Sequence, residues 1–184
     1  MKQSVPSLNL TFKPLVSDEL PLLHKWLNTP HVSKWWFLDL GIRNPTLEEV
    51  QSVWNRRLNN TEAVEYYIVL LDLTPIAFIQ WSILSEESKS MALVKKSDNV
   101  AGIDVFIGEE DCLYKGIGPV LINKFLEEIV FRNPDIQSCI IDPEPENTSA
   151  IRAYEKIGFK HTHTVYNEKI GVYAYMMGVA SKIE

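Results

Sequence analysis

The sequence predicts a single α/β domain in which a mixed, mostly antiparallel sheet is flanked by helices. Two observations lead to this prediction. Stretches with the two-residue alternation of strands are interleaved with stretches in which apolar residues recur every three or four positions. One helical stretch joins two consecutive buried strands, which predicts one parallel crossover and not a doubly wound sheet. The 184 residues, 46% hydrophobic and 23% charged, suit one globular domain over residues 1–184.

The chain opens with a strand and two helices. The alternating apolar residues of LNLTFKPLV predict a strand at residues 8–16. Ser17 and Asp18 offer N-cap oxygens to a short helix, whose apolar residues recur at helical spacing up to Leu27. A turn-rich segment then runs to position 45. After it, Thr46 and Glu49 form a capping box for a second helix, LEEVQSVWNRRL.

Three strands follow in the middle of the chain. The stretches EYYIVLLD and IAFIQWSIL, separated by a turn at LTP, predict a β-hairpin of buried strands. Residues 85–99 show no clean period, so we expect a loop there. The next strand is predicted at VAGIDVFIG, residues 100–108.

The last third of the chain completes the sheet. A helix with a regular apolar period follows the loop YKGIGP, and SCIID predicts a short buried strand that Pro143 stops. Asn147 or Thr148 can cap the helix SAIRAYEKI, which Gly158 closes. The stretches KHTHTVY and GVYAYMMGV alternate like an antiparallel pair. The predicted order is therefore β-α-α-β-β-β-α-β-α-β-β.

Charge and composition exclude several classes of function. A net charge of -6 and a pI near 5.3 argue against a nucleic-acid partner, whose phosphates require a basic surface, and suit a cationic small substrate. No apolar run is long enough for a membrane span or a signal peptide, so we expect a cytoplasmic protein without a membrane partner. Cys112 and Cys139 lie outside any CxxC pattern and are expected to be ordinary thiols. Either a monomer or a homodimer is compatible with the sequence.

The loop YKGIGP has the chemistry of an anion site. Gly116 and Gly118 let the backbone approach a ligand and direct free N–H groups at it, Lys115 adds a charge, and Pro119 suits a first helical turn. Leu121 stands where a dinucleotide fingerprint needs its third glycine, and no Lys-Ser or Lys-Thr follows as in a Walker loop. Taken alone, the loop predicts either a tight turn or a phosphate cradle.

Other polar residues stand out against their surroundings. Asp104 lies in the middle of an apolar strand, where a carboxylate needs a partner, a cleft or water. Tyr154 lies on a helix that starts beside the ends of the central strands. If its ring is buried there, its hydroxyl requires a hydrogen-bond partner. His161 and His163 alternate along one strand, but without an evident third ligand we expect a solvated strand face and no metal site.

These motifs together carry a resemblance. The stretches LYKGIG, DPEPEN and NTSAIRAYEKIGF, in this order, resemble the acetyl-CoA-binding half of the GNAT superfamily of N-acetyltransferases. Across nearly the whole chain, WLNTPHVSKWW, PIAFIQ, GID and IRAYEKIGF resemble the aminoglycoside 6′-N-acetyltransferases more specifically. The resemblance implies a GNAT fold and acetyl-CoA as the acetyl donor.

The resemblance also implies roles for individual residues. Backbone amides of the glycine loop are expected to bind the pyrophosphate of coenzyme A, which maps to Lys115, Gly116, Ile117, Gly118 and Pro119. The pantetheine arm is expected to pair with the main chain of Val105, Phe106 and Ile107 and to contact Asn147. Tyr154 is expected near the thioester sulphur. Asp104 is expected to contact or deprotonate the acceptor amine, Asp142 to bind the cationic sugar, and Trp35 and Trp36 to wall the acceptor pocket.

The chemistry of acetyl transfer is consistent with these roles. An ammonium has no lone pair, so a carboxylate such as Asp104, acting directly or through water, can activate it by removing a proton. A phenol such as Tyr154, with an ordinary pKa of about 10, can protonate the departing thiolate at neutral pH. Strand N–H groups near Val105 can polarise the thioester carbonyl.

Two departures from the family pattern bear on cofactor and substrate. Leu113 stands where superfamily members commonly carry Gln or Arg, although the backbone cradle does not depend on that side chain. Lys95 and Lys96 stand where the aminoglycoside enzymes carry acidic residues. With both departures, the resemblance still implies an acetyl-CoA-dependent transferase for the 6′-amine of an aminoglycoside, a resistance enzyme. The alternatives are transfer to a polyamine, a siderophore precursor or a protein N-terminus, and an acyl-CoA-binding domain without turnover.

Overall fold

The computed structural model describes residues 8–36, 42–60, 64–95, 98–168 and 171–180 of the chain. Seven strands form one sheet in the order β1-β2-β3-β4-β5-β7-β6. Their bounds are β1 Leu10–Pro14, β2 Val64–Leu71, β3 Thr74–Ile83, β4 Val100–Ile107, β5 Ser138–Ile141, β6 Lys160–Asn167 and β7 Val172–Ala180. The β4–β5 pair is parallel and the other neighbouring pairs are antiparallel. The predicted mixed, mostly antiparallel sheet with one crossover is therefore confirmed.

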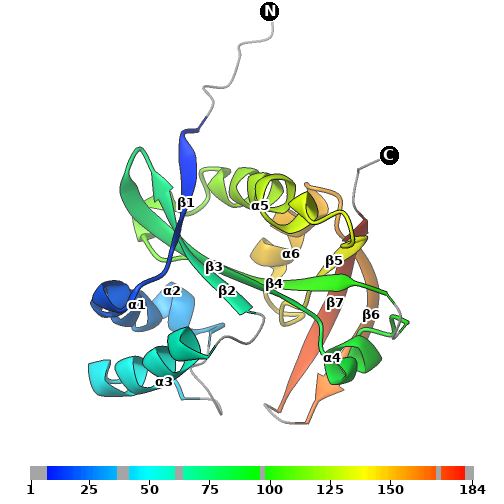
Figure 1. The fold of residues 1–184 in the computed structure, drawn as a ribbon, viewed down its shortest axis with the longest axis horizontal. Coiled ribbons are helices and arrows are strands. Elements are labelled where there is room, and N and C mark those ends of the chain that lie inside the picture. The colour runs from blue at the N-terminus through cyan, green and yellow to red at the C-terminus, as the bar shows by residue number, and fades with distance from the viewer. Residues whose placement is uncertain (1–7, 37–41, 61–63, 96–97, 169–170, 181–184) are drawn as a thin grey trace, which may run out of the picture.

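Helices cover both faces of this sheet (Figure 1). The helices α1 (Leu20–Leu27), α2 (Pro30–Ser33) and α3 (Leu47–Asn59) lie on one face. There, buried Trp26 and Trp54 pack in a cluster with Ile68 and Phe78 of the sheet. The helices α5 (Ile117–Glu128) and α6 (Thr148–Glu155) lie on the other face, over a second and larger cluster. Each face of the central strands is thus buried by its own apolar layer.

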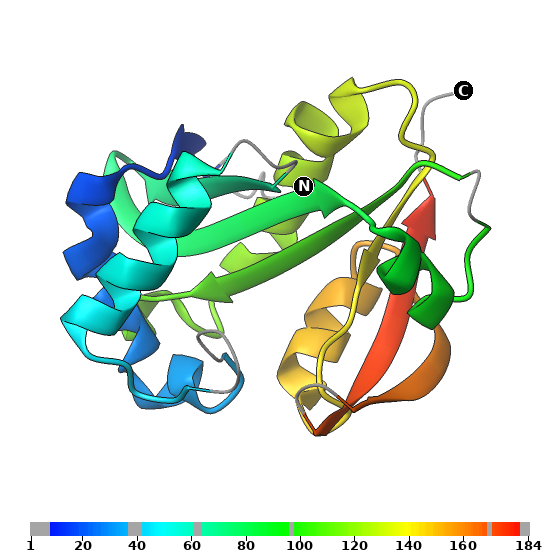
Figure 2. The ribbon, with the colours of Figure 1, turned by 60° about the horizontal axis from the view of Figure 1, so that its bottom comes forward.

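The sheet opens between β4 and β5 (Figure 2). The two strands pair only from Val100 with Ser138 to Gly102 with Ile140. Beyond that point β4 continues to Ile107 along β3, whereas β5 ends at Ile141 and pairs with β7. The second half of β4 therefore has a strand neighbour on one side only. This divergence separates the sheet into two halves and places Asp104 and Asp142 at the point where they part.

Several local predictions are confirmed by backbone and cap geometry. Thr46 accepts a hydrogen bond from Glu49 N (3.2 Å), and the Glu49 carboxylate accepts one from Thr46 N (2.7 Å), which completes the capping box of α3. Asn147 caps α6 by accepting from Ala150 N at 3.3 Å. Gly158, with φ of 100°, ends that helix in the left-handed conformation.

The prediction of a loop at residues 85–99 is wrong in part, because Glu86–Met91 form the helix α4. The helix is too short to show a period, so its stability comes from its ends and its contacts. Ser85 Oγ accepts from Ser88 N (3.2 Å) at the first turn, and His163 Nε2 bonds the Met91 carbonyl (2.7 Å) at the last. Ala92 is buried just after it. Tertiary contacts therefore order a polar segment that has no helical signature.

The predicted cap of the first helix is also wrong. Its first turn is a 3-10 helix over Ser17–Glu19, with Val16 at the cap position and no side-chain cap bond. The Ser17 hydroxyl instead donates to Asn55 Oδ1 of α3 at 3.0 Å. In addition, the turn-rich segment before residue 45 contains the one-turn helix α2, whose first residue is Pro30.

His161 and His163 do not share a strand face. A register shift lies between them in the β6–β7 ladder, which is the signature of a β-bulge. As a result the His161 ring stacks on Tyr175, with ring centroids 3.9 Å apart, while His163 reaches α4 on the opposite face. Among the described residues no group of three His, Cys, Asp or Glu side chains could hold a metal ion. The described helices include none with the length and hydropathy of a membrane span.

Candidate active site

A cavity of about 260 Å³ lies where β4 and β5 separate. Residues of β3, β4 and β5 form its floor, α4 forms one wall, and Asn167 of β6 with Met176 of β7 forms another. Fourteen described residues line it: Val64, Gln80, Trp81, Ser82, Leu84, Ser88, Met91, Gly102, Ile103, Asp104, Ile140, Asp142, Asn167 and Met176. The lining brings the two predicted acidic residues together, and Lys and Arg are absent from these fourteen. The cavity therefore suits a small cationic group.

Asp104 is the acidic residue on the floor of this cavity. It lies in the middle of β4 opposite Gln80 of β3, and Gln80 Nε2 donates to its Oδ2 at 2.8 Å. Burial raises the pKa of Asp104, while the Gln80 hydrogen bond and the charge of Arg57 act in the opposite direction. An ionised Asp104 thus keeps Oδ1 for a further partner and has a pKa that favours proton uptake.

Asp142 lies just beyond the end of β5 at the mouth of the same cavity, where part of the residue is exposed and its carboxylate is surrounded by protein. The surrounding protein desolvates its carboxylate, and the charge of Asp104 adds to the effect, so the pKa of Asp142 is raised to about 7. Each carboxylate is therefore harder to ionise while the other is charged. A cation placed between them relieves this repulsion, because it stabilises the charged form of both.

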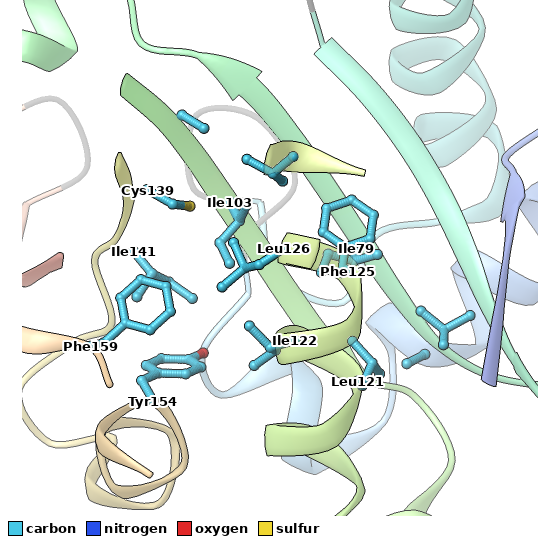
Figure 3. Close-up of a cluster of buried hydrophobic side chains, with 14 of the residues drawn as sticks. Ile79, Ile103, Leu121, Ile122, Phe125, Leu126, Cys139, Ile141, Tyr154 and Phe159 are labelled. Atoms are coloured by element: carbon cyan, nitrogen blue, oxygen red, sulfur yellow. The ribbon is translucent and has the colours of Figure 1, made fainter. Parts of the chain in front are cut away.

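Tyr154 approaches the opening from the other face of the sheet. Its ring is buried against Phe159, with centroids 6.1 Å apart, and its hydroxyl lies on the side of the ring toward Ile122 of α5 (Figure 3). Burial raises the pKa of Tyr154, and the charges of Asp104 and Asp142 raise it further. The phenol therefore stays protonated at neutral pH and remains a proton donor.

The open half of β4 presents main-chain groups that no strand occupies. Leu84 N bonds Val100 O and Gly108 N bonds Ile76 O, each at 2.8 Å, so every second residue of β4 faces β3. By this alternation Phe106 directs its N–H and C=O to β3, and its ring packs on Trp36 at 4.9 Å. Val105 and Ile107 direct their main-chain groups to the open side, where an extended ligand can add as a strand.

The glycine loop has the backbone geometry of an anion cradle. Gly116 adopts φ of 78° at the N-cap of α5, two residues after Tyr114 with φ of 58°. The first N–H groups of a helix have no intrahelical partners. In α5 these are the N–H groups of Ile117 and Gly118, since the next residue, Pro119, has no N–H. Lys115 is exposed beside them. The arrangement presents donors and positive charge to solvent at one end of α5.

The remaining predicted residues lie outside the cavity lining. Asn147 uses Oδ1 as the cap of α6, which leaves its amide N–H groups as donors. Trp36 packs edge-on against Phe78 and Phe106, on the sheet face that carries Asp104. The Lys34 ammonium lies 4.3 Å from the centre of the Trp35 ring. Trp36 thus borders the face of β4 that carries Asp104, and both tryptophans are partly buried.

Comparison with known proteins identifies the family of this chain. The family model described as "Acetyltransferase (GNAT) domain" matches residues 16–166. The chain belongs to the GNAT acetyltransferases. The match takes in β4, the glycine loop, α6 and both carboxylates of the cavity, so the GNAT assignment rests on the region that carries the site.

Relatives of this GNAT chain include enzymes named for aminoglycosides. It is 31% identical over 157 residues to the aminoglycoside N(6′)-acetyltransferase type 1 of Klebsiella pneumoniae, an alignment that covers 85% of this chain and 77% of that protein. The Serratia marcescens protein of the same name matches equally. Among solved structures, the AAC(6′)-Ib complex with ribostamycin and coenzyme A has 29% identity and a TM-score of 0.80, with 93% of each chain covered.

Sequence reasoning about this GNAT chain missed part of its cavity. Gln80, Ser88, Met91 and Asn167 were not predicted as site residues. The sequence does mark Gln80 as a candidate site residue, because it is a polar residue in an apolar strand, as Asp104 is. Ser88 and Met91 enter the wall only because α4 folds there.

Proposed function

We propose that the chain transfers the acetyl group of acetyl-CoA to a primary amine, the 6′-amine of an aminoglycoside. The observation that supports this most directly is the pairing of Asp104 and Asp142 in one cavity at the place where the edge of β4 becomes open. An amine held by the carboxylates lies next to a strand edge that can hold an extended thioester. We further propose that residues 1–184 act as one such domain.

The residues present fit acetyl-CoA. Its pyrophosphate matches the backbone donors of the glycine loop at Lys115, Gly116, Ile117 and Gly118, and Pro119, which has no N–H, closes the loop at the first turn of α5. The helix dipole of α5 favours the negative charge of the pyrophosphate. The amide-containing arm of acetyl-CoA matches the N–H and C=O of Val105 and the N–H of Ile107 on the open side of β4, with Asn147 as a further donor. When bound, acetyl-CoA supplies the acetyl group as an activated thioester.

Asp104 is proposed as the base. The acceptor enters as an ammonium, whose positive charge the cavity attracts, and must lose one proton before its lone pair can attack the thioester carbon. Asp104 Oδ1 takes this proton directly or through a water molecule, and general-base help of this kind contributes typically 10²- to 10⁴-fold. Gln80 holds Oδ2 and so keeps Oδ1 directed at the acceptor.

Val105 and Tyr154 are proposed to act on the donor. The Val105 N–H on the open side of β4 can donate to the thioester oxygen as charge develops on it. As the carbon–sulphur bond breaks, the electron pair leaves on sulphur, and Tyr154 donates its hydroxyl proton to that thiolate. The nitrogen loses its second proton as the amide forms, and this proton passes through solvent to the Tyr154 phenolate. Asp104 releases the first proton to solvent, and the acetylated amine and free coenzyme A are the products.

Asp142, Trp35 and Trp36 are proposed to hold the acceptor. Asp142 lies at the cavity mouth, where a second ammonium of an aminoglycoside can pair with it. Trp36 offers an aromatic edge on the same face, next to Phe106. Related enzymes support the assignment of the substrate, since AAC(6′)-Ib has also been solved with coenzyme A and kanamycin, at 29% identity and a TM-score of 0.79.

A smaller amine is the second candidate acceptor. Lys95 is exposed in the segment that leads from α4 to β4, where it repels a polycation, and Lys96, which the sequence places beside it, lies outside the described residues. Apart from the two carboxylates the cavity lining is uncharged, and its polar residues include Ser82, Ser88 and Asn167. An amine shorter than an aminoglycoside, such as lysine or spermidine, can meet the two carboxylates without approaching Lys95.

The test is a thiol-release assay with acetyl-CoA and a panel of amines that includes kanamycin, tobramycin, spermidine and lysine. We expect release with the aminoglycosides and a loss of at least about 100-fold in kcat/KM on Asp104→Asn. Release with spermidine or lysine alone assigns the smaller acceptor. Tight binding of coenzyme A without release for any amine supports the acyl-CoA-binding alternative and contradicts the transferase.

A further inference from the structure

His31 forms a contact with β4 on the side where the sheet is open. Its Nε2 lies 3.0 Å from the carbonyl oxygen of Ile107. A carbonyl oxygen only accepts hydrogen bonds, so Nε2 carries the proton and donates it. The ring is partly buried, and the nearby charges include Glu109, which accepts from Lys25 and Trp26. The tautomer is thus set by the bond to Ile107.

The strand register shows which groups this contact leaves for a ligand. Val105 and Ile107 direct their main-chain groups to the open side, and Phe106 directs its own to β3. Because His31 occupies the Ile107 carbonyl, the open edge keeps the N–H and C=O of Val105 and the N–H of Ile107. A ligand that adds as a strand needs alternating donors and acceptors at fixed spacing. At Ile107 the ladder acceptor is already engaged by His31, which leaves the oxygen one lone pair and makes it a weaker acceptor for a ligand.

Building on the proposed function, we propose that His31 is a positioning residue that fixes the register of the acetyl-CoA arm on β4. A strand-like ligand shifts by two residues at a time, about 6.6–6.8 Å, when it exchanges one set of main-chain partners for the next. A shift toward Ile107 moves the thioester away from Asp104 and needs the Ile107 carbonyl as an acceptor. His31 already engages that acceptor and so favours the register in which Val105 receives the arm.

The segment that carries His31 is itself well anchored. Thr29 Oγ1 donates to Trp26 O at 2.6 Å, Val32 is buried, and Trp36 N donates to Val32 O at 2.9 Å. The cation–π and edge contacts of Trp35 and Trp36 follow directly in the chain. Truncation of His31 therefore removes one hydrogen bond from a segment that other contacts hold in place.

The prediction concerns the variant His31→Ala and the matched variant His31→Gln. With the Ile107 carbonyl free, part of the bound acetyl-CoA takes the shifted, unproductive register. Unproductive binding lowers kcat and the KM for acetyl-CoA by the same factor, so kcat/KM stays within about twofold. Since one neutral hydrogen bond is worth about 1 kcal/mol, the fall in kcat is about fivefold. The amide N–H of His31→Gln keeps the donor and restores wild-type values.

Hydrogen exchange provides the readout that does not depend on turnover. Coenzyme A is expected to protect the Val105 amide in the wild-type protein and to protect it less in His31→Ala. His24→Ala, on the neighbouring helix α1, is the control and should match the wild type. Equal protection and unchanged kcat and KM in His31→Ala overturn the inference about His31 alone. An equal loss of kcat/KM in His31→Ala and His31→Gln also overturns the inference about His31. If coenzyme A does not protect the Val105 amide even in the wild-type protein, the proposed function is overturned as well.

Discussion

Gln80 Nε2 donates a 2.8 Å hydrogen bond to Asp104 Oδ2 across the β3–β4 ladder. The Gln80 amide oxygen is buried and, in the described part of the chain, has no hydrogen-bond partner. The Gln80 side-chain amide therefore acts as a hydrogen-bond donor to the Asp104 carboxylate. This one bond orients Asp104 and lowers its pKa against the effect of burial. Two neighbouring strand residues thus set both the direction and the basicity of the proposed catalytic group.

The first prediction is that Gln80→Met shifts the pH dependence of the reaction. Asp104 works as a base only when ionised, so kcat/KM falls as the pH drops through its pKa. Loss of the Gln80 donor raises that pKa further, which moves the acidic limb to higher pH, by about one unit for a bond of 1.4 kcal/mol. A pH–rate profile for kcat/KM measures the shift. An unchanged acidic limb in Gln80→Met contradicts the proposed role of this bond.

The second prediction reverses the sign of that shift. Asp104 raises the pKa of Asp142 by its charge, and the two carboxylates are coupled. In Asp142→Asn the neighbouring charge is absent, so Asp104 ionises more easily and the acidic limb moves to lower pH. The acceptor KM should rise, because one carboxylate no longer attracts it. Asp135→Asn, on the exposed loop before β5, is the control for a change of net charge.

The third prediction concerns stability and the same variant. The pKa of Asp142 in the folded protein, about 7, lies above the value of about 3.9 in an unfolded chain. A carboxyl with a raised folded pKa disfavours the folded state as the pH rises through this range. Asp142→Asn should therefore raise Tm at pH 8, by about 2–4 °C, and leave it unchanged at pH 4. Thermal unfolding at both pH values, without ligands, measures the difference. A gain at pH 4 equal to that at pH 8 shows that ionisation of Asp142 is not its cause.

Periodicity predicts most of this fold because the core contacts are made by regular apolar faces. The strands and the longer helices appear in the predicted order, with the caps at Thr46 and Asn147 and the close at Gly158. The helix α4 was missed because its residues are polar and its stability depends on Ser85 and His163, which lie outside it. Local patterns do not contain contacts of this kind.

The site is predictable to the extent that each residue conflicts with its local surroundings. Asp104 stands out as a carboxylate in an apolar strand, and Gly116 as a residue that needs a positive φ. The Gln80–Asp104 bond depends on the register between two strands that sixteen residues separate, which the sequence alone does not fix. The bulge that parts His161 from His163 is likewise a property of the ladder.

The fourth prediction is that Tyr154→Phe lowers kcat about 100-fold without loss of stability. The ring is packed against Phe159 in the α5 face of the core, and phenylalanine keeps that packing. The pKa of Tyr154 is raised, so its hydroxyl is protonated over the whole neutral range and only its removal abolishes donation. Single-turnover thiol release measures the step. Tyr166→Phe, on the exposed end of β6, is the control and should behave as wild type.

The fifth prediction separates backbone conformation from ligand approach in the glycine loop. Gly116 has φ of 78°, so Gly116→Ala forces a side chain into the left-handed region and should destabilise the protein by about 1–2 kcal/mol. A Cβ on Gly118 would lie 3.9 Å from Ile107 Cδ1, an ordinary contact, so Gly118→Ala should leave stability unchanged. Both variants should weaken coenzyme A binding: Gly116→Ala by disturbing the cradle, and Gly118→Ala by holding the pyrophosphate away from the helix N–H groups. Unfolding in urea and calorimetric titration with coenzyme A measure the two effects separately. Wild-type affinity in Gly118→Ala contradicts the placement of the pyrophosphate over this loop.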